Sequence, residues 1–232
     1  MVGKIDTDSF KTYFENSSVI TLREIGEYYR NVPVTTVNWR VYRLVGSGVL
    51  QRIGKGLYKI GETRVFVPQK SKKMQKIETF MQKKFPFVQY CQWDLSQINS
   101  FLQHLINFNV SFVDVEKDAI DSVYLTLKEN FPKVMAINNL YDSLSDFNNH
   151  VFVRPLISES PMQKTGAPTL EKILVDLAVD KEFISFQGNE IFTLFRSALE
   201  QYTVNRNTLI RYAARKNKKE EIKNILLSIN RQ

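Results

Sequence analysis

The chain has 232 residues, a formal net charge of +8, 43% hydrophobic and 24% charged residues, one cysteine and two histidines. This composition is typical of a globular protein of one or two domains. A single cysteine excludes an intramolecular disulfide, and one cysteine with two histidines cannot supply the four ligands of a structural zinc site made of Cys and His. Because there is no apolar run of about 18 residues and no apolar signal core at the N-terminus, we expect a cytoplasmic protein without a membrane helix.

The first 66 residues have the pattern of three helices followed by a β-hairpin. Phe10 and Phe14 recur at helical spacing, and Thr21 and Glu24 match a capping box that starts a second helix. In chain order, the predicted elements are a helix over residues 6–15, a helix from residue 21 to a break at residues 31–33, a helix over residues 37–45 capped by Thr35 or Thr36, and strands over residues 49–53 and 57–60 joined through a glycine-containing turn. This order predicts a winged helix-turn-helix domain over residues 1–66.

The rest of the chain, residues 67–232, alternates helix and strand patterns before it ends in helices. The predicted strands cover residues 87–91, 110–115, 133–137 and 150–156, and the predicted helices cover residues 70–84, 95–106, 119–129, 169–179, 188–202, 205–215 and 218–230. This alternation predicts an α/β domain with a partly parallel sheet and a helical C-terminal part. The whole chain is therefore expected to be a two-domain protein of mixed α and β structure.

Charge is distributed unevenly along the chain, with a net +9 over residues 1–84, −6 over residues 85–180 and +5 over residues 181–232. Between Glu27 and Glu62 there is no acidic residue, as expected of a surface that approaches the polyanionic DNA backbone. A recognition helix reads bases with its N-terminal half, where arginine suits guanine and asparagine suits adenine. We therefore predict binding of double-stranded DNA, with groove contacts from Thr36, Asn38, Arg40 and Arg43, a cap or phosphate contact from Thr35, and wing contacts from Arg52, Lys55 and Lys59.

Other interpretations of the basic segments stay open. The polar face of the third helix could be merely solvated, and winged helices also serve as protein–protein modules. Trp39 could pack against the wing or stack on the sugar and backbone of DNA. The basic run over residues 206–223 could be a solvated face, extend the DNA contact or meet RNA. DNA is favoured because the acid-free span coincides with the two elements that would touch it.

Several segments of the sequence resemble the AbiEi-type antitoxin family. They are residues 20–25 (ITLREI), 38–44 (NWRVYRL), 48–58 (GVLQRIGKGLY), 168–176 (PTLEKILVD) and 209–215 (LIRYAAR), whereas residues 85–155 match only in pattern. The resemblance implies a DNA-binding autorepressor and antitoxin of a type IV toxin–antitoxin, or abortive-infection, system. It also implies that the C-terminal domain neutralises a nucleotidyltransferase-like toxin, directly or without a stable complex.

Two carboxylates stand out in the predicted helix over residues 169–179. Glu171 lies beside the apolar face of this helix, and Asp176 follows near its end. We expect Glu171 to form a structural ion pair with a basic residue of the C-terminal helices, such as Arg211 or Arg215. The alternative is that these four residues contact the toxin.

No complete catalytic set is present, so we predict no enzyme activity, no cofactor and no metal. Glu116 and Lys117 follow a strand as in a metal-dependent nuclease, but adjacent strand residues face opposite sides. Cys91 and His104 lack a third group that would orient the base, and a buried structural cysteine is favoured. The alternative function is a winged-helix regulator unrelated to a toxin, with a ligand-sensing apolar pocket in residues 85–160. A cluster of carboxylates that binds Mg²⁺ would instead indicate a DNA-modifying enzyme.

Overall fold

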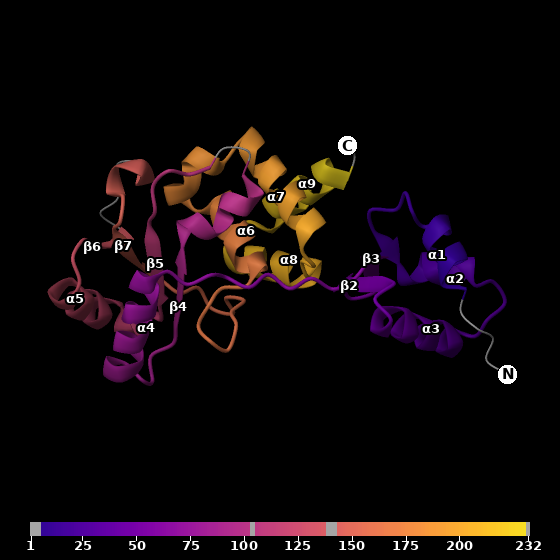
Figure 1. The fold of residues 1–232 in the computed structure, drawn as a ribbon, viewed down its shortest axis with the longest axis horizontal. Helices are drawn as coiled ribbons and strands as arrows, with labels where there is room; N and C mark the ends of the chain where they lie inside the picture. Colours follow the sequence, from indigo (N-terminus) through magenta and orange to yellow (C-terminus); the bar gives the residue numbers. More distant parts are fainter. Residues whose placement is uncertain (1–5, 103–104, 138–142, 231–232) are drawn as a thin grey trace. The chain divides into compact units, whose positions relative to one another are not determined.

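The computed structural model of the chain describes residues 6–102, 105–137 and 143–230 (Figure 1). It is a mixed α+β structure with two small sheets. The chain divides into two compact units. Unit 1 consists of Met1–Phe66 together with Leu199–Thr208, and unit 2 consists of Val67–Ala198 together with Leu209–Gln232. Residues 199–208, which the sequence pattern groups with the second domain, thus belong to unit 1.

The described part of unit 1 combines helices with a small antiparallel sheet. Its elements are α1 (Thr7–Tyr13), β1 (Ile20–Thr21), α2 (Leu22–Tyr28), α3 (Val34–Gly46), β2 (Leu50–Gly54) and β3 (Leu57–Ile60). The strands pair in the order β1-β3-β2, and β2 and β3 form the predicted hairpin. The sequence pattern did not reveal β1, because two residues are too few to show the alternation of a strand.

A side-chain cap starts each of the first two helices. The Asp6 carboxylate accepts a hydrogen bond from the Ser9 N–H at 3.2 Å. The Thr21 hydroxyl accepts from the Glu24 N–H at 3.1 Å, and the Glu24 carboxylate accepts from the Thr21 N–H at 2.6 Å. The predicted capping box of the second helix is therefore confirmed.

The third helix begins differently from the prediction. The expected cap at Thr35 or Thr36 is wrong, because α3 begins at Val34 with Pro33 at the N-cap position. The Pro33 carbonyl accepts a hydrogen bond from the Thr36 N–H at 2.9 Å. Proline fixes its own φ angle, so it can lead into a helix without a capping side chain.

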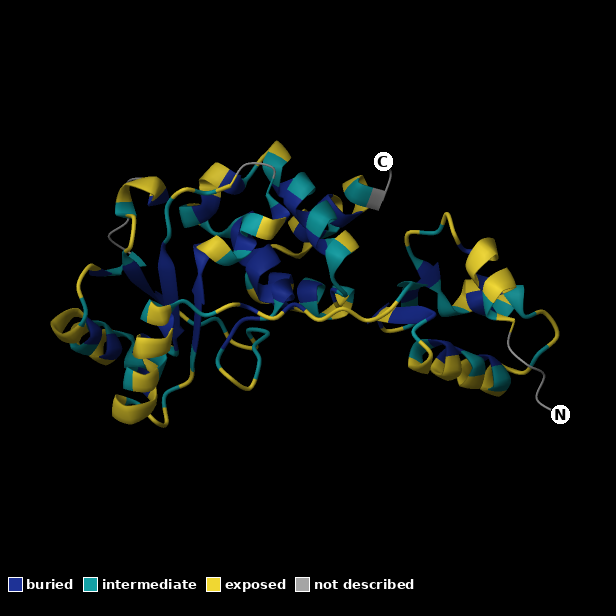
Figure 2. Cartoon of the chain, in the orientation of Figure 1, coloured by how far each residue is buried: buried dark blue, intermediate teal, exposed yellow. Residues whose placement is uncertain are grey.

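A compact apolar core joins the helices of unit 1 to one face of its sheet. The apolar stripe of α3 faces inward as predicted, with Val37, Val41 and Leu44 buried. The stripe packs with residues from α1 and its C-cap, β1, α2 and the hairpin, which are Phe10, Phe14, Ile20, Ile25, Leu50 and Tyr58. This packing leaves the opposite side of α3 exposed, as its yellow outer surface shows (Figure 2).

Residues 199–208 lie against the hairpin within unit 1. The Thr203 hydroxyl hydrogen-bonds the Gln51 side chain on β2, and the Lys59 ammonium on β3 donates to the Leu199 carbonyl at 2.6 Å. The Thr203 N–H also donates to the Arg64 carbonyl at 2.8 Å. Gln51 and Lys59 are opposite each other in the β2–β3 register and therefore share one face of the hairpin, which this later segment contacts.

A mixed sheet with strand order β4-β5-β7-β6 forms the centre of unit 2. β4 (Tyr90–Asp94) runs antiparallel to β5 (Ser111–Val115), whereas β5 and β6 (Val134–Ala136) both run parallel to β7 (Val151–Pro155). The predicted partly parallel sheet is therefore confirmed. Strands with both faces covered are buried along most of their length, as in Figure 2.

The two faces of this sheet are covered by different helices. Alternate residues such as Val113 and Val153 face α4 (Lys72–Lys84) and α5 (Ile120–Asn130). The residues between them point to the other side, where Phe112 contacts the rings of Trp93 and Phe183. Figure 1 shows α6 on that second side, away from α4 and α5. The charged residues of interest lie on this second face.

Several boundaries in unit 2 differ from the sequence prediction. The strand expected at residues 87–91 is β4, three residues later, since buried Gln92 and Asp94 interrupt the apolar pattern that marks its end. The helix expected over residues 95–106 is a 3-10 helix, η1 (Leu95–Phe101), and His104 lies outside the described residues. The C-terminal helices are α6 (Leu170–Val179), η5 (Lys181–Phe186), α7 (Asn189–Gln201), α8 (Arg206–Arg215) and α9 (Lys219–Asn230).

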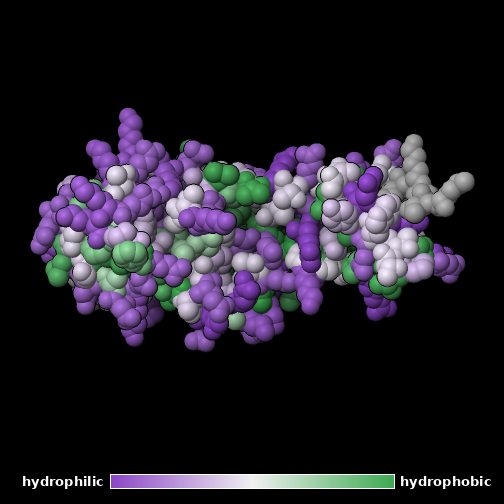
Figure 3. Space-filling view, turned by 90° about the horizontal axis from the view of Figure 1, so that it is seen from below, coloured by the Kyte–Doolittle hydropathy of each residue, from purple (hydrophilic) through white to green (hydrophobic). Residues whose placement is uncertain are grey.

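In the described part of the chain, no helix has the length and apolar character that crossing a membrane requires. The face drawn in Figure 3 is mostly hydrophilic, and its hydrophobic side chains occur in separate patches. Single exposed apolar side chains are normal on globular proteins.

Candidate functional site

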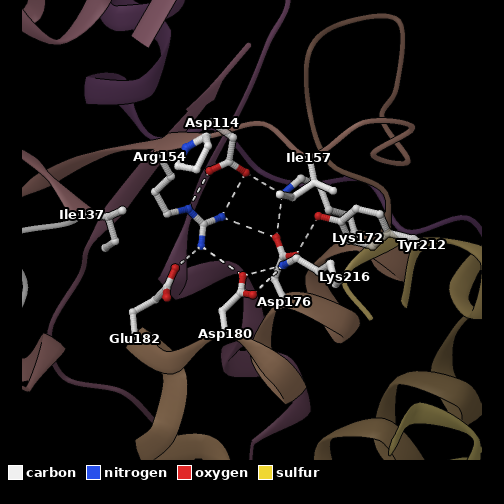
Figure 4. A pocket seen from close by; sticks show the side chains of 11 residues that line it. Asp114, Ile137, Arg154, Ile157, Lys172, Asp176, Asp180, Glu182, Tyr212 and Lys216 are labelled. Atoms are coloured by element: carbon white, nitrogen blue, oxygen red, sulfur yellow. Dashed lines mark hydrogen bonds and ion pairs between the residues drawn. The ribbon is translucent and has the colours of Figure 1, made fainter. Parts of the chain in front are cut away.

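A group of charged side chains lies on the second face of the unit 2 sheet. We call it the charge cluster, and it consists of Asp114, Arg154, Lys172, Asp176, Asp180, Glu182 and Lys216 (Figure 4). Its members come from β5, β7, α6, the start of η5 and the residue after α8. Charged groups are costly to remove from water unless they are paired, so each must find its partner inside the protein.

Asp114 and Arg154 form the innermost pair. The parallel register places them directly opposite each other on β5 and β7. Nε and one terminal nitrogen of Arg154 donate to the two Asp114 oxygens at 2.6 and 3.0 Å, which is the strong bidentate geometry. The guanidinium carbon also lies 4.5 Å from the ring centroid of Phe112, so the cation contacts an aromatic face.

Lys172 and Asp176 complete the inner layer from α6. They are four residues apart and share one face of the helix. The Lys172 ammonium donates to Asp114 at 2.5 Å and to Asp176 at 2.6 Å. The other Asp176 oxygen accepts from the Tyr212 hydroxyl at 2.9 Å and from Lys216 at 2.5 Å. All four inner carboxylate oxygens therefore accept hydrogen bonds.

Asp180 and Glu182 form the outer layer. Lys216 donates to both Asp180 oxygens at 2.6 Å, and Arg154 donates to Glu182 at 2.7 Å. Their side chains are 20% and 13% exposed, more than the other members of the cluster. They line a pocket of about 180 Å³, whose wall is completed by Ile137, Pro155, Ile157 and Tyr212 (Figure 4).

The pKa values of the inner Asp176 and the outer Asp180 are shifted in opposite directions. Burial acts to raise the pKa of Asp176, but Lys172, Lys216 and Arg154 outweigh it and hold that pKa far below the usual range. In the outer layer, burial and the neighbouring Asp176 raise the pKa of Asp180 to about 6, against the opposing effect of Lys216. The inner carboxylates thus stay ionised, whereas Asp180 titrates close to neutral pH.

The polar side chains that line the pocket are mostly carboxylates and cations that pair with one another. Within the described residues, no three His, Cys, Asp or Glu side chains are grouped in a way that could hold a metal ion. Cys91 is buried on β4, and burial raises the pKa of its thiol to about 12, so it stays a thiol at neutral pH. The pocket is also smaller and more polar than the large apolar cavity that a drug-sized ligand needs. The pocket has a size that suits a small polar ligand beside the outer carboxylates.

A second candidate surface lies in unit 1. We call it the α3–hairpin surface, and its members are all exposed: Thr35, Asn38, Trp39, Tyr42, Arg43, Arg52 and Lys55. Trp39 and Tyr42, 43% and 75% exposed, lie three residues apart on the side of α3 opposite the buried stripe. Tyr42 was missed by the sequence prediction, although its helical spacing from Trp39 was visible. The Arg52 Nε donates to the Gly54 carbonyl at 3.2 Å, so this side chain lies at the hairpin turn.

Three of the predicted DNA contacts are less available. Thr36 is half-buried at the flank of α3. The Arg40 guanidinium lies 4.3 Å from the ring centroid of Tyr29 and is half-buried as well. The Lys59 ammonium donates a hydrogen bond to the Leu199 carbonyl, and burial lowers the pKa of Lys59. These three side chains are therefore left out of the α3–hairpin surface.

The predicted partner residues of unit 2 are only partly brought together. The predicted pairing of Glu171 with Arg211 or Arg215 stays a prediction, whereas Asp176 forms buried ion pairs. Its partners are the cations of the charge cluster, because α8 presents Tyr212 rather than Arg211 to the cluster. Arg211 is exposed, Arg215 pairs with Glu159, and Glu171 is buried on α6.

The fold and the two sites define a two-unit α+β protein, with an exposed acid-free face on one unit and a buried charge cluster in the other. A search of curated proteins found none that match the chain. A family model matches residues 36–232, and its description is "Family of unknown function (DUF6577)". The chain belongs to this family.

Proposed function

We propose that unit 1 is a winged helix-turn-helix that binds double-stranded DNA and that the protein regulates transcription. The supporting observation is the order of elements, in which α2 and α3 are followed by the β2–β3 hairpin and β1 pairs with β3. In that fold the second helix of the pair enters the major groove and the hairpin serves as the wing.

The exposed side of α3 carries this proposal. It presents Asn38 and Arg43 to solvent, and its buried stripe holds it against the core of unit 1. No carboxylate lies on α3 or on the hairpin, while Arg52 and Lys55 flank the turn. A face without acidic groups can approach phosphates, and asparagine and arginine offer paired hydrogen bonds to base edges.

We extend the proposal to autorepression and antitoxin activity because of the sequence segments that resemble AbiEi-type antitoxins. The segments over residues 20–25, 38–44 and 48–58 lie in α2, α3 and the hairpin, so they coincide with the proposed DNA-binding elements. Those over residues 168–176 and 209–215 include Asp176 and Tyr212, which are hydrogen-bonded to each other in unit 2. Unit 2 would then neutralise a nucleotidyltransferase-like toxin.

The first experiment measures binding of the protein to its own upstream DNA by fluorescence anisotropy at several salt concentrations. Arg43→Ala or Asn38→Ala should cost about 1–3 kcal/mol and relax the base preference. Lys55→Ala should weaken all sequences alike and lower the salt slope by about 0.9. Lys164→Ala, an exposed lysine in unit 2, is the matched control.

Wild-type affinity in all three variants of unit 1 would refute the DNA proposal. The exposed rings of Trp39 and Tyr42 then favour a protein partner, since aromatic side chains are enriched at such interfaces. The antitoxin part has a separate test, which is rescue of growth on co-expression with a neighbouring nucleotidyltransferase-like protein. Failure of that rescue would leave DNA binding intact.

A further inference from the structure

We propose that the pocket of the charge cluster binds a small organic cation, an alkylammonium such as a diamine, between Asp180 and Glu182. This site lies in unit 2 and is independent of DNA binding. The argument rests on the charge balance of the cluster, on a carboxylate oxygen to which no described residue donates a hydrogen bond, and on the size and wall of the pocket.

The charge cluster contains one more carboxylate than it has cations. Four carboxylates face Arg154, Lys172 and Lys216. The inner two carboxylates accept two hydrogen bonds from Lys172 and those from Nε and one terminal nitrogen of Arg154. Asp180 shares Lys216 with the inner Asp176. Both outer carboxylates face the remaining terminal nitrogen of Arg154, which lies 2.7 Å from Glu182 and 3.6 Å from Asp180. The excess negative charge therefore lies at the mouth of the pocket.

One carboxylate oxygen of Glu182 is available to a ligand. Glu182 accepts from Arg154 through Oε1, and no described residue donates to its Oε2. Both outer carboxylates reach the same terminal nitrogen of Arg154, so they lie close enough to share one ammonium group. An ammonium donates three hydrogen bonds and carries the missing positive charge. Burial and the neighbouring Asp176 raise the pKa of Asp180 to about 6, so a proton is the alternative way to neutralise this carboxylate.

The volume and the wall of the pocket set the size of the cation. The pocket of about 180 Å³ is comparable to a cavity of roughly 150 Å³ that holds a benzene molecule in another protein. Ile137, Pro155 and Ile157 complete the wall, so methylene groups can contact apolar side chains while the ammonium meets the carboxylates. A short alkyl chain with one or two amino groups fits this description, and an anion does not.

The experiment is isothermal titration calorimetry of the full chain with 1,4-diaminobutane and n-butylamine at constant ionic strength. We expect saturable binding at one site, tighter than about 1 mM. Neutral 1-butanol should not bind, and tetramethylammonium should bind more weakly because it has no N–H donors. Glu182→Gln should weaken binding about tenfold or more, since it removes one negative charge and keeps the size. Glu129→Gln, at an exposed carboxylate on α5, is the control and should bind like the wild type.

Asp180→Asn provides a second variant if Glu182→Gln does not fold. Binding to the wild type should also weaken as the pH is lowered from about 7.5 to about 5.5, because a proton then competes for Asp180. The charged groups that face Asp180 are Asp176, Glu182, Lys216 and Arg154. The neighbouring cations hold the pKa of Asp176 far below this range, and the neighbouring carboxylates hold the pKa values of Lys216 and Arg154 above it, despite burial. No saturable heat with either amine, or equal binding of 1-butanol, would overturn the proposal. Loss of DNA binding in the unit 1 variants would not affect the proposal that unit 2 binds a cation.

Discussion

Replacing Lys172 by methionine tests how strongly the charge cluster depends on its inner cation. Lys172 is 2% exposed, and its ammonium lies 2.5 Å from Asp114 and 2.6 Å from Asp176. Methionine keeps the length of the side chain and removes the charge, which leaves two cations beside four carboxylates. Breaking a buried pair by removal of one partner costs about 3–5 kcal/mol, because an uncompensated charge stays behind. We expect Lys172→Met to lower the free energy of unfolding of unit 2 by that amount.

The assay is urea unfolding followed by the fluorescence of Trp93, which is buried against Phe112 in unit 2. Trp39→Phe as a background removes the other tryptophan, so the signal reports unit 2 alone. Adding Asp176→Asn to Lys172→Met returns the cluster to the wild-type excess of one carboxylate over its cations, and the double variant should be more stable than the sum of the single changes predicts, by about 0.5–3 kcal/mol. Lys164→Met, at an exposed position, should stay within about 0.5 kcal/mol of the wild type. A loss below about 1 kcal/mol for Lys172→Met would refute the reasoning about the inner layer.

Three further predictions follow from the hydrogen bonds and the pKa shift described above. Tyr212→Phe removes the hydroxyl that donates to Asp176 at 2.9 Å, and it should cost about 1.5–3 kcal/mol in the same urea assay. The pKa of Asp180 is about 6 in the folded protein and 3.8 ordinarily, so its protonated form contributes about 3 kcal/mol of stability below roughly pH 4, and this is lost as the pH rises through 6. Asp180→Asn should abolish that slope, and an unchanged slope would contradict the assignment. Lys59→Met should leave the salt slope of DNA binding unchanged, because this ammonium already donates to a main-chain carbonyl, whereas Lys55→Ala lowers the slope by about 0.9.

The helices and most strands could be predicted from the sequence because their signals are local. The stripe of Val37, Val41 and Leu44 repeats at helical spacing over enough residues to identify α3. Signals failed where they were short or mixed. β1 has two residues, and β4 contains buried Gln92 and Asp94, whose polarity hides the strand from a hydrophobicity pattern.

The charge cluster could be predicted only in part. Lys172 and Asp176 are four residues apart within a helix whose other residues, apart from Glu171, are apolar, and this spacing was a visible signal of a buried pair. The partnership of Asp114 with Arg154 depends on the parallel register of β5 and β7, which residues 40 positions apart do not reveal in a single sequence. Lys216 follows α8, and its place in the cluster depends on tertiary packing. The same limit applies to the predicted pairing of Glu171 with Arg211 or Arg215, which also depends on tertiary packing.

The cost of the charge cluster argues that stability alone does not explain it. Replacing a buried ion network by well-packed apolar side chains is often neutral or stabilising, so such networks are poor devices for stability. Here the network joins β5, β7, α6, η5 and the residue after α8, and every link is a hydrogen bond with a fixed direction. A cation bound at Asp180 and Glu182 would balance the one charge that the network leaves over, and it would stabilise all five segments together by mass action. The same residues would then serve both as the support of unit 2 and as the place where a ligand is sensed.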